Sequence, residues 1–206
     1  MTQPWLPLFV NLADRLVVAT AGGADLLDAV NRAAAGGARL RLAGDSMDGL
    51  PDGVETASAD AASLDGASLL LLGGGSEDTD QALASAAAER GVLTVHLDHS
   101  GATGSAVLAA GAGSPGLSVA VSTGARAPEL ESRLVADLHR GLPAENDDLA
   151  EILTGLRAKL EDRFPEAERR EAIWQQVLDS PVLALLQAGD EDEAAELAER
   201  MAWGAG

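Results

Sequence analysis

The stretch that decides the fold reads Ser118-Val-Ala-Val-Ser-Thr-Gly-Ala-Arg-Ala-Pro-Glu-Leu130. A short apolar run of β type breaks at Ser122-Thr-Gly124, and Pro128 then begins a helix that ends near Leu142-Pro143. Unpaired N–H groups and partial positive charge gather where a helix begins. The amides and hydroxyls of this turn are therefore expected to converge on an anion. The alternative is a turn that only caps the helix.

Upstream of this stretch, short apolar runs alternate with Ala-rich helical segments. Alternation of this kind indicates βαβ units and a parallel sheet, because right-handed crossovers place the helices over both faces. We assign residues 1–112 to such a Rossmann-like domain. The expected strands are Leu16–Thr20, Leu40–Ala43, Ser68–Leu72 and Val92–Leu97, and the expected helices are Asp25–Ala35 and Asp78–Arg90.

The sequence after Leu142-Pro143 is charged and helix-forming. It begins with leucines and an isoleucine at the spacing of one helical face, namely Leu149, Ile152, Leu153, Leu156 and Leu160. Two further helices are expected around Glu166–Ser180 and Glu191–Met201, so residues 144–206 form an all-helical domain. The segment 113–143 is too short to have its own core, and we predict that it dimerises.

Composition narrows the classes of function. A net charge of −19 argues against nucleic acid as a partner, because its phosphates would be repelled. The longest apolar run, near 67–72, is too short to cross a bilayer, and the N-terminal residues lack the pattern of a secretory signal. The absence of cysteine excludes disulfides. We expect a cytoplasmic protein with neither a nucleic-acid nor a membrane partner.

The order strand, Ser-Thr-Gly, Pro-x-Leu, helix, Leu-Pro resembles the middle of the precorrin-2 dehydrogenase/sirohydrochlorin ferrochelatase family, which includes the N-terminal module of bacterial sirohaem synthase. Other pieces resemble the family in the same order. They are Trp5-Leu-Pro-Leu-Phe9, Arg15-Leu-Val-Val-Ala-Thr-Ala-Gly-Gly23, Gly37-Ala-Arg39, Arg90-Gly-Val-Leu93, Leu156-Arg157 with Phe164, and Arg169-Arg-x-x-x-Trp174. The resemblance implies a homodimer that oxidises precorrin-2 to sirohydrochlorin with NAD, and it leaves open whether Fe²⁺ is then inserted.

The resemblance also implies a place for NAD. Gly22 and Gly23 follow the first strand at the family's Gly-Gly-Gly turn, where Ala21 takes the first position. Glycine at this turn lets a pyrophosphate approach the backbone. Gly74 follows the third strand, and Asp45 follows the second, where an acid would bind ribose hydroxyls. A glycine turn without nucleotide, and an Asx turn at Asp45, are the alternatives.

Asp98 is the candidate catalytic residue. It follows the fourth strand at the end where doubly wound sheets bind ligands, and the family's important carboxylate lies in such a position. A carboxylate in a partly dry cleft is suited to accept a proton. The alternative is an Asp that ends the strand or caps a turn. His96 and His99 flank Asp98, and histidine is a common metal ligand. Two or three ligands without cysteine are weak evidence for a metal site, so we assign no metal.

The resemblance assigns substrate binding to Ser122, Thr123, Gly124 and Arg126, which would contact the carboxylates of a tetrapyrrole. Three departures from the family reduce the expected polar and cationic contacts. Asp28-Ala29 stands where Arg-Lys is usual, and Gly73-Gly-Gly-Ser-Glu77 stands where Ala-Thr-Asp-Asp is usual. Ser132 and Val135 stand where arginines are usual. They favour the alternative of a diverged, non-catalytic member that binds a tetrapyrrole or nucleotide. An unrelated Rossmann-like oxidoreductase is a third interpretation.

Overall fold

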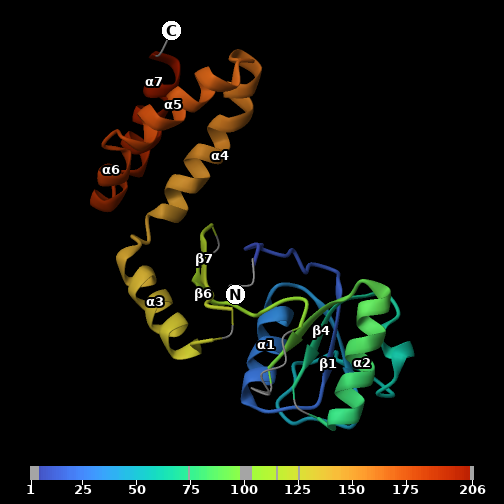
Figure 1. The fold of residues 1–206 in the computed structure, drawn as a ribbon. Helices are drawn as coiled ribbons and strands as arrows, with labels where there is room; N and C mark the ends of the chain where they lie inside the picture. Colours follow the sequence, from blue (N-terminus) through green and yellow to red (C-terminus); the bar gives the residue numbers. More distant parts are fainter. Residues whose placement is uncertain (1–4, 74, 98–103, 115, 125, 205–206) are drawn as a thin grey trace. The chain divides into compact units, whose positions relative to one another are not determined.

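The computed structural model describes residues 5–73, 75–97, 104–114, 116–124 and 126–204. The chain divides into two compact units, Met1–Leu108 and Ala109–Gly206, which are described separately (Figure 1). Among the described residues, no helix combines the length and the apolar character needed to cross a membrane.

The first unit contains a five-stranded parallel sheet with the strand order β3-β2-β1-β4-β5. This is the Rossmann order, with a reversal between β1 and β4, and the predicted fold is confirmed. Its elements are β1 (Leu16–Thr20), α1 (Ala24–Ala35), β2 (Arg39–Ala43), β3 (Glu55–Ala57), the 3₁₀ helix η1 (Ala61–Leu64), β4 (Ala67–Leu72), α2 (Glu77–Arg90) and β5 (Leu93–His96).

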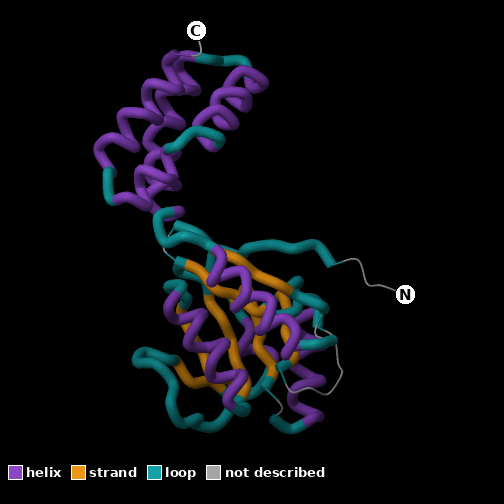
Figure 2. Tube along the Cα trace, turned by 90° about the vertical axis from the view of Figure 1, so that its left-hand side faces the viewer, coloured by secondary structure: helices purple, strands orange, loops and turns teal. Residues whose placement is uncertain are grey.

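All five residues of β1 are buried because helices cover both faces of the sheet (Figures 1 and 2). Alternate side chains of a strand point to opposite faces. Val17 and Ala19 accordingly pack with the α1 side chains Leu26 and Val30. On the other face, Leu16 and Val18 belong to the core that includes Leu83 and Ala87 of α2. The continuous apolar run Leu-Val-Val-Ala thus fits a parallel strand buried on both sides.

The second unit begins with a hairpin and a helix. Strand β6 (Ala110–Gly113) pairs antiparallel with β7 (Ser118–Val121), and α3 (Pro128–Gly141) contacts both strands. Strand β6 was not among the expected strands, because Ala-Gly-Ala-Gly has neither β-branched nor aromatic residues and becomes a strand by pairing with β7. On α3, Val135 is buried, but three leucines are 40–49% exposed: Leu130, Leu134 and Leu138.

Four helices complete this unit: α4 (Asn146–Arg163), α5 (Ala167–Leu178), α6 (Val182–Ala188) and α7 (Glu191–Gly204). The predicted all-helical region is confirmed, but the sequence predicted one helix fewer. The missing helix is α6, a two-turn apolar segment between Pro181 and Gly189 that is too short to show a periodic face. The helices pack around a common core formed by Leu156, Leu160, Phe164, Ile173, Val177, Val182, Leu186, Ala194, Ala198 and Ala202.

Candidate active site

The carboxyl ends of β1 and β4 lie side by side where the strand order reverses, which is where doubly wound sheets bind their ligands. Gly22 and Gly23 lie in the turn after β1, and Gly73 begins the turn after β4. Thr20 Oγ1 accepts a hydrogen bond from the Gly73 amide at 3.0 Å. This bond holds the two turns together.

Gly22 and Gly23 have different surroundings. A Cβ atom at Gly22 would lie 2.6 Å from the carbonyl oxygen of Gly73, and one at Gly73 would lie 3.0 Å from Gly22 Cα. Glycine is therefore required at both positions by the close approach of the two turns. At Gly23, by contrast, an added Cβ would meet nothing within 4 Å, and this residue is the exposed N-cap of α1 without a side-chain cap. The backbone at Gly23 is thus open to a ligand.

Asp45 lies at the same edge of the sheet. It lies two residues after the end of β2, the neighbour of β1, and its side chain is exposed. The preceding Gly44 has a φ of +125°, a conformation that other residues rarely adopt. Gly23 and Asp45 therefore fit a dinucleotide: the first leaves room for a pyrophosphate at the start of α1, and the second offers a carboxylate to ribose hydroxyls.

The helices that begin at this edge of the sheet carry acidic side chains in their first turns. Asp25 lies in the first turn of α1, and the first turn of α2 contains Glu77, Asp78 and Asp80. Asp80 is only 7% exposed. Carboxylates stabilise helix N-termini, but here they lie where a nucleotide phosphate would approach. The backbone thus fits the cofactor, whereas the charges oppose its phosphates.

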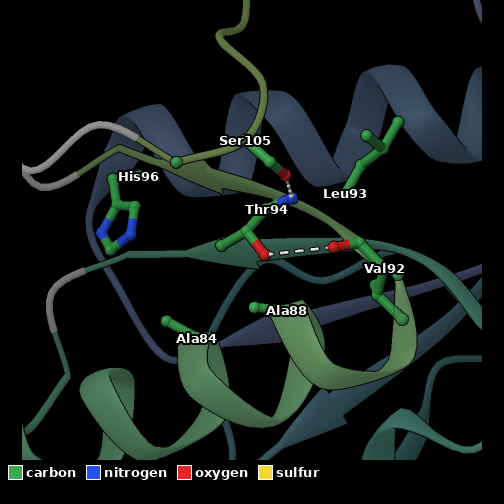
Figure 3. A pocket seen from close by; sticks show the side chains of 9 residues that line it. Ala84, Ala88, Val92, Leu93, Thr94, His96 and Ser105 are labelled. Carbon is green, nitrogen blue, oxygen red and sulfur yellow. Dashed lines mark hydrogen bonds between the residues drawn. The ribbon is translucent and has the colours of Figure 1, made fainter.

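A pocket of about 420 Å³ lies beside β5 (Figure 3). Its wall combines Ala84 and Ala88 of α2 with Thr94 and His96 of β5. Ser105 Oγ accepts a hydrogen bond from the Thr94 amide at 2.9 Å, which holds residue 105 against the edge strand. The His96 side chain lies at one end of this mostly apolar pocket.

Three predicted or considered site residues lie outside the described residues: Asp98, His99 and Gly74. Leu97 still pairs with β4, since its amide donates to the Leu72 carbonyl at 2.8 Å. Within the described part of the chain, no group of three or more His, Asp or Glu side chains is arranged to hold a metal ion.

The Ser-Thr-Gly turn is a closed hydrogen-bonded unit. Both the amide and the hydroxyl of Thr123 donate to Glu131 Oε1, the hydroxyl at 2.6 Å. Thr123 Oγ1 in turn accepts from the Ala127 amide at 2.9 Å, and Ser122 Oγ accepts from the Gly124 amide at 3.0 Å. The donors that were expected to bind an external anion thus bind groups of this chain.

Ser122 and Arg126 remain exposed in this unit. Arg126 Nε donates to the Thr123 carbonyl at 2.8 Å, which fixes the side chain at one nitrogen. Sequence reasoning did not identify Glu131. Its only signal in the sequence is an acid in the first helical turn after Pro128, because the contact with Thr123 joins residues that are eight positions apart.

The fold defines a protein of the Rossmann type, in which the parallel sheet is followed along the chain by a hairpin–helix segment and a group of helices. Comparison with protein families adds that residues 147–201 match the sirohaem synthase dimerisation region. The curated relatives include a sirohaem synthase of Thioalkalivibrio sulfidiphilus, 29% identical over 95% of this chain and 42% of the relative. Another, from Pseudomonas fluorescens strain SBW25, is 29% identical over 94% of this chain and 43% of the relative.

Among solved structures, "SirC, precorrin-2 dehydrogenase" has the same fold, with a TM-score of 0.68 and 14% identity. The alignment covers 95% of this chain and all of that one. Together, the comparisons show that the chain is similar in sequence to sirohaem synthases and similar in fold to a precorrin-2 dehydrogenase, in agreement with the resemblance of its sequence. The chain spans less than half the length of the sirohaem synthases that it matches.

Proposed function

We propose that the chain oxidises precorrin-2 to sirohydrochlorin with NAD⁺, as a homodimer in the cytoplasm. The observation that carries this proposal is the edge of the sheet where the strand order reverses. It is open at Gly23, includes Asp45, and belongs to a chain related to sirohaem synthases. A further role in inserting Fe²⁺, as a substrate, remains part of the proposal because one carboxylate can serve both reactions.

The reaction removes two hydrogens from the tetrapyrrole. A hydride leaves from one C–H bond of the tetrapyrrole, and a proton leaves from a second bond to hydrogen. The electrons that remain form a new double bond in the tetrapyrrole. NAD⁺, when bound, would supply the hydride acceptor and would be reduced to NADH. Asp98 is the proposed base that accepts the proton, because it follows β5 at the ligand-binding end of the sheet.

The remaining groups are proposed to bind and orient the cofactor and the tetrapyrrole. Amides of Gly22, Gly23 and Gly74 are proposed to face the cofactor, and Asp45 to hold its ribose. Ser122 and Arg126 are proposed to contact carboxylates of the tetrapyrrole, because both are exposed and retain donors. A guanidinium suits this role since it can donate two parallel hydrogen bonds to a carboxylate.

The alternative is a diverged member that binds a tetrapyrrole or nucleotide without oxidising it. Two observations favour this alternative. Acidic residues lie in the first turns of both α1 and α2. The amide and the hydroxyl of Thr123 both donate to Glu131 of the same chain. Each removes an attraction for an anionic ligand.

Calorimetry with NAD⁺ and with sirohydrochlorin, each titrated into the purified chain, separates the two. The dehydrogenase requires both to bind and predicts that NAD⁺ binding is lost on Asp45→Ala. The control is Asp48→Ala, an exposed acid three residues further along. Absence of NAD⁺ binding together with binding of the tetrapyrrole would overturn the dehydrogenase and support the alternative.

A further inference from the structure

We propose that Arg163 and Arg170 form a binding site for carboxylate groups in the helical part of the second unit. The site lies where α4 ends and α5 begins, around the ring of Phe164. That the carboxylates belong to a tetrapyrrole rests on the proposed function, whereas the existence of the site does not.

Arginine and aromatic side chains from three helices gather at this point. The guanidinium carbon of Arg163 lies 5.6 Å from the centre of the Phe164 ring and 5.3 Å from that of the Trp203 ring on α7. Arg169 of α5 lies 4.4 Å from the same Phe164 ring. Arg170 Nη1 donates to the carbonyls of Phe164 and of the proline that follows it, both at 2.7 Å. Three guanidinium groups thus surround one buried ring.

The contacts of Arg163 and Arg170 are unusual for this chain. Acidic residues outnumber basic residues by 33 to 14, and a typical arginine such as Arg32 pairs with a carboxylate, that of Asp28, at 2.9 Å. Within the described ranges, by contrast, no carboxylate oxygen lies within 4.0 Å of a guanidinium nitrogen of Arg163 or Arg170. Contacts with rings and carbonyls leave the positive charge of both groups in place.

The ring contacts hold Arg163 without using its hydrogen-bond donors. A guanidinium that lies on an aromatic ring uses its face, and its five N–H groups point outward in its plane. Arg163 is exposed, so these groups can be reached from solvent. Arg170 donates to the two carbonyls through Nη1 alone, which leaves Nε and Nη2. A carboxylate can accept two parallel hydrogen bonds from one such group.

Stabilisation of the helices accounts for only part of this arrangement. Arg163 lies in the last turn of α4, where the helix dipole favours a cation, and Arg170 satisfies a carbonyl beyond that turn. Arg169, however, lies in the first turn of α5, where the dipole disfavours a cation. Three like charges around one ring also repel one another. A bound carboxylate would offset this repulsion.

A tetrapyrrole is the source of carboxylates that fits the proposed function. Asp28, Ser132 and Val135 stand where basic residues are usual in the family that the sequence resembles. Arg163 and Arg170 would supply cations that those positions lack. A small free carboxylate is the other source, and binding measurements distinguish the two.

Citrate, which presents three carboxylates, is the probe for the site itself. Trp203 contacts Arg163 and becomes the sole tryptophan when Trp5 and Trp174 are replaced by phenylalanine. Citrate, exchanged for chloride at constant ionic strength, should change its fluorescence saturably. Arg163→Gln in this background should weaken citrate binding at least about tenfold, because charged hydrogen bonds are lost.

Arg200→Gln is the matched control and should leave citrate binding unchanged. Arg200 is an exposed arginine of α7 that pairs with Glu196 at 3.5 Å. Arg163→Lys covers the case in which Arg163→Gln does not fold. It keeps the charge but cannot donate two parallel hydrogen bonds, so it should weaken binding at least about fivefold. Wild-type affinity in Arg163→Lys would show that charge alone acts and would overturn the proposal.

Calorimetry with sirohydrochlorin then identifies the source. Weaker binding in Arg163→Gln than in Arg200→Gln assigns the site to carboxylates of the tetrapyrrole, whereas an effect on citrate alone assigns it to free carboxylates. If the affinity for neither ligand is lower in Arg163→Gln than in Arg200→Gln, the proposal is overturned. These measurements require no turnover, so an inactive enzyme would contradict the proposed function and leave this test intact.

Discussion

At the residue scale, neighbouring glycines have different roles. The backbone of Gly22 lies against Gly73, where the Thr20 hydroxyl also joins the two turns. Gly23 has open space around it. The Gly22-Gly23 pair, which resembles a nucleotide-binding motif, therefore contains two kinds of position. Packing requires glycine at Gly22, whereas Gly23 has space for a ligand.

Gly22→Ala should lower the free energy of unfolding by about 2–3 kcal/mol, because its methyl group would meet the backbone of Gly73 and the side chain of Leu26. The matched variant Gly23→Ala should cost under about 1 kcal/mol, mainly because alanine is a poorer N-cap. Urea denaturation of both variants checks the difference. Equal losses would contradict the packing role of Gly22.

Asp98→Asn should lower the rate of sirohydrochlorin formation by roughly 10²–10⁴-fold, because an amide keeps the shape of the side chain but cannot accept a proton. NAD⁺ affinity and the Tm should be unchanged. If Asp98 only caps a turn, turnover is retained and stability falls by about 1 kcal/mol or less. Wild-type turnover in this variant would exclude Asp98 as the base.

At the element scale, α3 presents Leu130, Leu134 and Leu138 at intervals of four residues, all substantially exposed. Residues so spaced share one helical face, and an exposed apolar face of this kind is typical of an interface. The predicted dimerisation segment, 113–143, includes this helix. The region that matches the family's dimerisation region, 147–201, lies after it in the sequence.

Leu134→Glu should convert a dimer to a monomer, because the charge would be buried in the interface. Ala136→Glu adds the same charge at an exposed position on another side of α3 and should leave the dimer intact. Light scattering over a range of protein concentrations gives the result. A Leu134→Glu chain that stays dimeric would remove this helix face from the interface.

The sequence predicted those elements whose pattern is local. Strand β1 is a continuous apolar run, and α1 has one apolar face, so each was found to within a residue. Strand β6 and helix α6 were missed because pairing and packing, rather than their own composition, define them.

Parts of the candidate site could be predicted for the same reason. Gly23 and Asp45 follow strands whose order is fixed by the βαβ pattern, so their common edge follows from topology. The approach of Gly22 to Gly73 and the seating of Glu131 on Thr123 depend on side chains and turns brought together by folding. No residue spacing specifies such distances.

At the scale of the whole molecule, the net charge of −19 acts on any anionic ligand. Asp25 adds a carboxylate where the cofactor's phosphates would lie. Salt screens such repulsion, with a Debye length that falls from roughly 10 Å at 0.1 M to 3 Å at 1 M. Calorimetry should therefore show NAD⁺ binding several-fold more tightly in 1 M than in 0.1 M KCl. Weaker binding at high salt would indicate phosphate contacts with cations instead.

The most direct test of the account is turnover by the purified chain. Precorrin-2 and NAD⁺ are supplied without oxygen, and sirohydrochlorin and NADH are followed by their absorbance. If the chain is a precorrin-2 dehydrogenase, both products form in equal amounts and omission of NAD⁺ stops the reaction. Asp45→Ala then lowers the rate at limiting NAD⁺. A chain that binds the tetrapyrrole but forms no sirohydrochlorin at saturating NAD⁺ would contradict the account.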